Sequence, residues 1–263
     1  MIELLLNKNG NYEYCYDVKQ QEEITIKVAE GVDATCVLCF HGERFALKKT
    51  LELYPYSSLH IVYRNECSAY RSEEKVILHE DAHLCVGYYE LGDHSANVDA
   101  VYSLVEREAK VDIITTSLAQ NQKQFYISCE HQCGHTYSNM EHYAINKAGG
   151  SVNITASGKI MKGAKESQSH QSTRVLTLAD KEKVSITPLL LIDENDVAAS
   201  HACAIGEMNE DHLYYLQTRG LSKEAALGLL TLSYVLPILR VVESWEIMYQ
   251  QLSEDINSKV GLA

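Results

Sequence analysis

Two side chains that can bind a soft metal lie close together in the last third of the chain. His201 and Cys203 are separated by one residue, in a short alternating segment that runs into the start of a helix. In an extended strand, residues two apart point to the same face. Imidazole and thiolate are both ligands for iron and zinc. The spacing therefore makes His201 and Cys203 candidate metal ligands on one face of a strand.

A second group of such residues occurs at alternate positions: Cys129, His131, Cys133 and His135. On a straight strand all four would face one side, with neighbours about 6.6 Å apart and the next nearest about 13 Å apart. Bonds from zinc to its ligands are only about 2.0–2.3 Å long. One ion could join a neighbouring pair, but not the whole set. The group is either a transient metal or sulfur ladder or an inward stack inside a narrow solenoid, and the distances favour the stack.

The remaining cysteines give weaker signals. Cys36 and Cys39 form a CxxC, but they lie in a strand-like run without Gly or Pro, so we interpret them as part of a buried strand. The eight cysteines are irregularly spaced and no export signal precedes them, which argues against a disulfide framework. The chain has no nucleophile elbow, phosphate-binding glycine loop or HExxH, and hence no nucleotide-hydrolysing motif.

Composition narrows the class of protein. The 263 residues are 46% hydrophobic and carry a formal net charge of −13, which argues against binding nucleic acid or an anionic membrane. The longest apolar stretch, residues 225–239, is interrupted by Ser233 and Pro237 and is shorter than the ~20 residues of a membrane span. We expect a soluble, cytoplasmic protein.

Short alternating segments fill the region from about Glu22 to Ile192 and recur every 10 to 14 residues. They are rich in Thr, Val, Ile and Tyr, as β-strands are. The segments are residues 24–28, 34–40, 59–63, 76–79, 111–114, 124–127, 151–155, 174–178 and 189–192. A sandwich, a barrel and a stacked solenoid all fit this pattern, because no strict repeat separates them.

After Gly206 the hydrophobic period changes from that of a strand to that of a helix. Asn209 can cap a helix over residues 210–218, and Ser222 can cap the next, which Pro237 ends or kinks. A third helix is predicted over residues 239–257, with Val242, Trp245, Met248, Tyr249 and Leu252 as its apolar stripe. We therefore expect a β domain over residues 1–206 and a helical domain over residues 207–263.

Several longer motifs carry a family resemblance. KGAKESQSH at residues 162–170 resembles the K-G-A-K-x-S-x-S-H turn of SufB-type proteins, and the QSTR that follows resembles the next rung with a SufD-type arginine, Arg174. SHACAIG at residues 200–206 and LYYLQTRGL at residues 213–221 are similar to the C-terminal signature of the SufB/SufD family. These proteins are scaffold subunits of the SUF iron–sulfur cluster assembly machinery. The resemblance implies a right-handed parallel β-helix core followed by a small helical domain.

Departures from the SufB pattern indicate a SufD-like member. SufB-type proteins carry a functional cysteine three residues after the turn histidine, His170; here that residue is Thr173. SufB glutamates flank the histidine that matches His201; here Ser200 and Ala202 flank it. The resemblance makes His201 a candidate cluster ligand at a subunit interface, with Cys203 either an extra ligand or a packed thiol. The similarity is clear only from about Thr136 onward, residues 1–95 match no quoted motif, and the usual N-terminal helical domain is expected to be absent.

The resemblance implies a non-catalytic scaffold with two partners. A SufC-type ABC ATPase would dock on the C-terminal helices, around Tyr214, Tyr215, Arg219 and Gly220, and a second SufB/SufD-type subunit would meet the end of the β-helix. The implied cofactor is a transient iron–sulfur cluster at that interface, with none held tightly by the isolated chain. Two alternatives remain: a carbohydrate-active β-solenoid enzyme, and a purely structural homodimeric β-helix protein.

Overall fold

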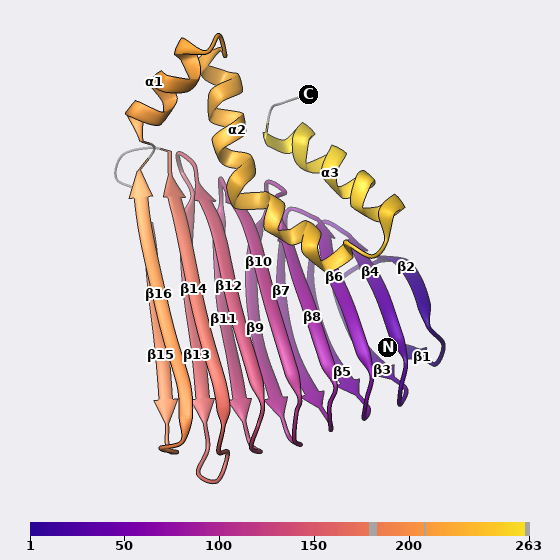
Figure 1. Cartoon of the computed structure of the whole chain (residues 1–263). Helices are drawn as coiled ribbons and strands as arrows, with labels where there is room; N and C mark the ends of the chain where they lie inside the picture. Colours follow the sequence, from indigo (N-terminus) through magenta and orange to yellow (C-terminus); the bar gives the residue numbers. More distant parts are fainter. Residues whose placement is uncertain (179–182, 208, 261–263) are drawn as a thin grey trace.

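The computed structural model describes residues 1–178, 183–207 and 209–260, and within them sixteen strands alternate between two parallel sheets (Figure 1). The first sheet contains β1 (Ile2–Leu6), β3 (Gln21–Val28), β5 (Arg44–Leu53), β7 (Ala69–Leu78), β9 (Ser95–Leu104), β11 (Gln122–His131), β13 (Ser151–Ile160) and β15 (Lys183–Ile192). The second contains β2 (Gly10–Asp17), β4 (Asp33–His41), β6 (Ser58–Glu66), β8 (His83–Glu90), β10 (Lys110–Ala119), β12 (Tyr137–Asn146), β14 (Ser167–Thr177) and β16 (Val197–Glu207). The expected parallel β-helix is confirmed.

The turns of the solenoid become longer toward its C-terminal end. Register pairs in the first sheet link Ile24, Lys49, Glu74, Ala100, Ile127, Ala156 and Pro188 in succession. The spacing grows from 25 residues between Ile24 and Lys49 to 32 between Ala156 and Pro188. A drifting period of this kind explains why the sequence shows no strict repeat although the structure repeats regularly.

One corner of the solenoid repeats a left-handed backbone conformation. The residues concerned, all with positive φ, are Gly31, Tyr56, Asp81, Glu108, His135 and Glu166. Their amides can stack along the solenoid axis: the N–H of Tyr56 donates to Glu80, and the N–H of His135 donates to Lys165, each on the following turn. Only the first of the six is glycine, the residue that adopts this conformation without strain, so the repeated corner leaves little trace in the sequence.

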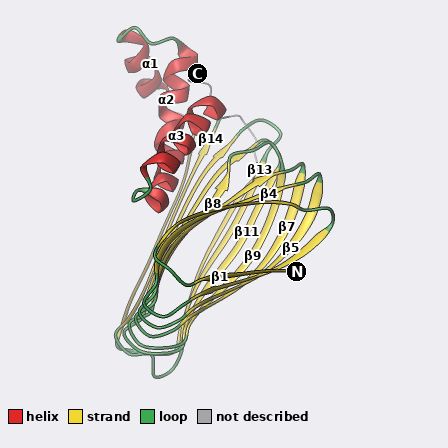
Figure 2. Ribbon diagram, turned by 90° about the vertical axis from the view of Figure 1, so that its right-hand side faces the viewer, coloured by secondary structure: helices red, strands yellow, loops and turns green. Residues whose placement is uncertain are grey.

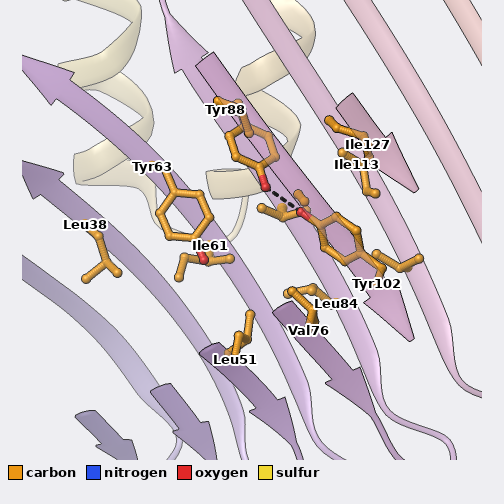
Figure 3. Close-up of a cluster of buried hydrophobic side chains, with 14 of the residues drawn as sticks. Leu38, Leu51, Ile61, Tyr63, Val76, Leu84, Tyr88, Tyr102, Ile113 and Ile127 are labelled. Atoms are coloured by element: carbon orange, nitrogen blue, oxygen red, sulfur yellow. Dashed lines mark hydrogen bonds between the residues drawn. The ribbon is translucent and has the colours of Figure 1, made fainter. Parts of the chain in front are cut away.

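The interior is mostly apolar, but it encloses a charged group near its middle. The Glu74 carboxylate accepts hydrogen bonds from the Tyr63 and Tyr88 hydroxyls, both at 2.5 Å, and pairs with the Lys49 ammonium at 2.9 Å. The Tyr88 and Tyr102 hydroxyls are 2.6 Å apart, among leucine, isoleucine and valine side chains (Figure 3). A buried carboxylate requires this degree of compensation, because an unpaired charge is costly in an apolar interior.

The two ends of the solenoid differ. At the N-terminal end, Tyr12, Tyr14 and Tyr16 point inward from β2 and stack with ring centroids 6.3 Å apart, and Phe40 continues the stack at 6.0 Å. The three tyrosines are half-buried and cover the core. At the C-terminal end, strands β15 and β16 have no comparable cover among the described residues.

The helices follow β16. Helix α1 (Glu210–Thr218) is capped by the Asn209 side chain, which accepts from two backbone amides, and α2 (Lys223–Val235) is capped by Ser222. Gly220 takes φ +94 between them. The predicted first two helices are confirmed, since capping residues and a glycine stop fix their boundaries locally.

The third predicted helix was wrong in its start, while Val242, Met248 and Leu252 of its predicted stripe are buried and Tyr249 is not. Residues Leu236–Val242 form a 3-10 helix, η1, and α3 begins only at Glu246 and runs to Val260. Pro237 cannot donate the backbone hydrogen bond that would continue α2, so the chain tightens instead. In α3 the buried side chains are Met248, Leu252 and Ile256, while Tyr249 is exposed.

Helices α2, η1 and α3 pack on the outer face of the second sheet (Figure 2). Ile238 and Val241 of η1 lie so close to β8 that a Cβ on Gly87 would meet them at 2.7 and 3.1 Å. The continuous helical run Lys223–Val242 has 20 residues and is long and apolar enough to cross a membrane by length and composition alone, so the expectation that this stretch is too short was wrong. Within the most apolar 18 consecutive residues of this run, 44% are buried against the rest of the protein.

Candidate functional site

The C-terminal end of the solenoid presents core-facing side chains to solvent. Among the residues that the structure describes, β15 pairs only with β13 and β16 only with β14, so this last turn has no following layer (Figure 1). We call its inward-facing residues the open end; they are Val184, Ile186, Pro188, Leu190, Ile192, Val197, Ala199, His201, Cys203 and Ile205. Their register partners on the preceding turn are buried. His201, Cys203 and Ile205 of the open end are exposed.

His201 and Cys203 lie in this open end. Parallel register places His201 beside Gln171 and Cys203 beside Thr173, and both partners point into the solenoid and are buried. The two candidate ligands therefore share a face, as alternation along β16 requires. Partial burial raises the pKa of the Cys203 thiol, and a hydrogen bond with Thr173 partly offsets the rise. A metal at this site would have to displace the thiol proton.

The other family-motif positions are divided between two faces. Thr173 points inward, whereas His170 and Arg174 lie at the alternate positions of β14 and point outward. The Nδ1 atom of His170 is 2.7 Å from the Ser200 hydroxyl, and its ring lies 5.9 Å from the Tyr137 ring. His170 therefore bonds along the outer surface and does not face His201 across the strand.

The four residues Cys129, His131, Cys133 and His135 are not on one strand. Strand β11 ends at His131, and Cys133 and His135 lie in the following turn, where His135 takes φ +60 at the repeated left-handed corner. The His135 side chain instead faces Glu166 at 3.4 Å and Glu108 at 4.0 Å. A uniform strand spacing therefore does not apply beyond His131.

Cys129 and His131 point into the interior and are fully buried. Both ring nitrogens of His131 are engaged at 2.8 Å, one with the Thr136 hydroxyl and one with the Ser138 hydroxyl. Burial lowers the pKa of His131 to about 4 and raises the pKa of Cys129 to about 12. This environment favours an inward stack of neutral groups over a metal ladder.

A polar row that the sequence did not reveal leads from the interior to the open end. Successive register pairs join Thr115, His142, Thr173 and Cys203. The Nδ1 atom of His142 is 2.9 Å from the Thr115 hydroxyl, while Nε2 is buried and has no hydrogen-bond partner among the described residues. Burial lowers the pKa of His142 to about 4. The only signal in the sequence is a spacing of 27 to 31 residues, which has meaning once the register is known.

The predicted docking segment forms an exposed helix. No residue of α1 is buried, and Tyr214 and Tyr215 are 70% and 56% exposed. The Arg219 guanidinium lies 5.2 Å from the centre of the Tyr215 ring and donates a hydrogen bond to its hydroxyl at 3.3 Å. Further exposed leucines are Leu221 before α2, Leu229 on α2 and Leu236 at the start of η1.

These features define a parallel β-solenoid with one covered end, one open end carrying soft ligands, and a helical extension. A family model described as SUF system FeS cluster assembly, SufBD core domain, matches residues 12–234, and the chain belongs to this family. Most of residues 1–95, which match none of the motifs named in the sequence analysis, therefore lie inside the family domain. The prediction of a SufB/SufD-type protein is confirmed.

Among its relatives is the iron-sulfur cluster assembly protein SufD of Bacillus subtilis, 37% identical over 97 residues, which are 37% of this chain and 22% of that protein. An iron-sulfur cluster assembly SufBD family protein of Pyrococcus horikoshii is 37% identical over 87 residues, 33% of this chain and 20% of that protein. Another, of Archaeoglobus fulgidus, is 33% identical over 84 residues, 32% of this chain and 22% of that protein. The matched part of the chain spans about a fifth of the length of these relatives.

Proposed function

We propose that the protein is a non-catalytic, cytoplasmic scaffold subunit of a SUF-type iron–sulfur assembly complex, and that a cluster forms transiently at its open end. The proposal rests mainly on one observation. In this family member, His201 and Cys203 lie on the inward face of β16, in the last turn of the solenoid, where no further turn covers them among the described residues. Exposed imidazole and thiol groups there are accessible to iron supplied from solution or from a partner.

A second SufB/SufD-type subunit is the partner that the open end fits. Unpaired edge strands and exposed apolar side chains, including Leu191, Ile192 and Ile205, favour association with another chain. If two copies or two related chains meet end to end about a two-fold axis, the same residues of both face each other. His201 and Cys203 would then supply ligands from both sides of the interface.

The exposed surface of α1 supports docking of a SufC-type ABC ATPase. Tyrosine and arginine are the residue types that most often dominate binding energy at protein interfaces. Tyr214, Tyr215 and Arg219 occupy one helix that packs little on the solenoid. This helix can therefore engage a partner without disturbing the β core, which itself carries no nucleotide-hydrolysing motif.

The competing proposals have less support. A polysaccharide hydrolase needs two carboxylates at about 5–9.5 Å in an accessible groove. The buried carboxylates Glu74 and Glu90 are instead enclosed in the interior and paired with Lys49, His94 and tyrosine hydroxyls. A purely structural homodimer would share the open end but would need neither His201 nor Cys203.

Anaerobic co-expression with a SufC-type ATPase and a second scaffold subunit tests the proposal. We expect a stable complex containing iron and sulfide, whose iron content falls severalfold in His201→Ala while the complex stays assembled. His41→Ala is the matched control, because His41 is a partly exposed histidine at the other end of the solenoid. Wild-type iron content in the His201→Ala complex would assign His201 a structural role only.

A further inference from the structure

A second constellation of soft ligands lies at the opposite end of the protein from His201. Cys15 of β2 is the register partner of Cys39 of β4, and Glu13 lies two residues before Cys15 on the same face. The ligand atoms of Glu13, Cys15 and Cys39 all lie within 4.8 Å of one another. We propose that these three residues bind a divalent transition-metal cation of the Zn²⁺ or Fe²⁺ type.

Strand geometry brings the three ligands together without a special loop. Alternation along β2 places Glu13 and Cys15 on the outer face of the second sheet, and parallel pairing places Cys39 directly beside Cys15. Around a tetrahedral zinc ion with bonds of about 2.3 Å, neighbouring sulfur ligands are about 3.8 Å apart. Ligand atoms that all lie within 4.8 Å of one another are compatible with this spacing.

The site is half open. Cys39 is buried in the cluster that the helices cover, whereas Cys15 and Glu13 are exposed at the edge of that cover. Three protein ligands leave a fourth position on the solvent side, as in sites that exchange a ligand or pass on a metal. Cys36, the other half of the CxxC, points into the solenoid interior and takes no part.

The charges around the pair suit a bound cation. Two thiolates and one carboxylate around a divalent ion leave one net negative charge. Arg64, the register partner of Cys39 on β6, can offset it. Its guanidinium also contacts Glu66 at 2.8 Å and Asp255 at 3.7 Å, and Asp255 is paired with Lys259. Arg64 is thus held in place beside the site.

The ligand set selects the class of metal. Thiolates favour zinc and iron over magnesium and calcium, which prefer oxygen ligands only. Burial raises the pKa of the Cys39 thiol to about 12, so the metal must displace a proton and its affinity should rise with pH. The Glu13 carboxylate offers a third ligand beside the two thiols.

Cobalt binding to the full-length chain, under reducing conditions without oxygen, tests the proposal. All proteins carry Cys203→Ser, so that thiolate-to-cobalt charge transfer reports only other sites. We expect one cobalt per chain with a tetrahedral spectrum, displaced by Zn²⁺. Cys15→Ser should weaken cobalt binding by at least about 100-fold, because loss of a direct ligand costs more than loss of a residue that only hydrogen-bonds to a ligand. Glu13→Gln should weaken it by at least about 10-fold.

Cys67→Ser is the matched control, since Cys67 is a partly buried thiol away from the pair, and it should leave the cobalt spectrum unchanged. Circular dichroism checks that each variant is folded; Cys15 and Glu13 are exposed, so their substitution should not affect folding. Unchanged cobalt binding in Cys15→Ser would overturn the proposal. So would a Cys15–Cys39 disulfide that forms on air exposure even with excess Zn²⁺ present. Neither result bears on His201 or on assembly with partners.

Discussion

Cys203 lies directly beside Thr173 on the inward face of the last two strands of the second sheet, so an exposed thiol has a buried hydroxyl as its nearest neighbour along the ladder. The same in-register relationship brings Cys15 and Cys39 together at the other end. Position 173 is the position at which the SufB-type pattern has a cysteine and this chain has a threonine. The pair thus distinguishes a one-thiol open end from a two-thiol one.

Replacing Thr173 by cysteine should convert the open end into a two-thiol site. Cysteine is close to threonine in size, so we expect Thr173→Cys to fold normally. Added to a Cys15→Ser background, it should strengthen the thiolate–cobalt band above that of the background protein, because two in-register thiols and His201 can share one ion. Thr173→Ser is the control and should leave the band unchanged. If Thr173→Cys also left it unchanged, Cys203 would not be oriented for metal binding.

The exposed tyrosines of α1 should carry much of the affinity for the ATPase. Tyr214→Ala with Tyr215→Ala should weaken binding by about 2 kcal/mol or more, measured by calorimetry, if they form the centre of the interface. Removing all residues after Gly206 is a poorer test, because it would uncover the apolar outer face of the second sheet. Tyr56→Ala, an exposed tyrosine on a solenoid turn, is the matched control. Equal affinity in both variants would place the dock elsewhere.

Gly87 should be essential for seating the helices on the sheet. Gly87→Ala would bring a methyl group 2.7 Å from Ile238 Cδ1 and 3.1 Å from Val241 Cγ2, so we expect a loss of about 1–3 kcal/mol in the free energy of unfolding. Urea denaturation measures it. Gly206→Ala, whose added Cβ meets nothing within 4 Å, should change stability by less than about 0.5 kcal/mol.

Buried His142 should make the protein sensitive to mild acid. Its pKa is lowered by burial to about 4 in the folded state, against about 6.5 when unfolded, so the unfolded chain binds the proton first. The contribution of neutral His142 to the free energy of unfolding is fully present above pH 6.5 and is lost as the pH falls toward 4. Between pH 7 and 5 the loss from this group is about 2 kcal/mol.

Urea denaturation at the two pH values checks this, with His142→Asn as the variant. The fall in unfolding free energy should be about 2 kcal/mol smaller in His142→Asn than in the wild type. His212→Asn, at an exposed position on α1, should behave as the wild type does. An unchanged pH dependence in His142→Asn would show that the pKa of His142 is not lowered in the folded state.

Local pattern predicted the strands and first two helices, but not every strand could be found that way. Residues 83–90 are buried on almost every side, because the helices cover the outer face, and such a strand does not alternate. Strand β5 was missed because a charged residue, Lys49, occupies an interior position. A lysine is expected to face solvent unless its buried partner, Glu74, is known.

The sites depended still more on register. Alternation alone placed His201 and Cys203 on one face, but their position at the open end required the pairing with Gln171 and Thr173. The strand-based spacing from Cys129 onward failed because a left-handed corner at His135 interrupts it. Cys15 and Cys39 are separated by a full turn of the solenoid, whose length drifts, so no fixed period could have paired them.

The unlike ends of the solenoid also limit how many chains can join. A stack of identical open turns could add chains indefinitely and grow into a fibre. Here the tyrosine stack of β2 differs in shape and chemistry from the open last turn, so a head-to-tail contact would join unlike surfaces. In the proposed end-to-end pairing the last turn meets its own copy, and a self-matching surface is used up after one contact. If chains pair through their last turns as proposed, the covered ends would stop further growth and the assembly would close at two subunits.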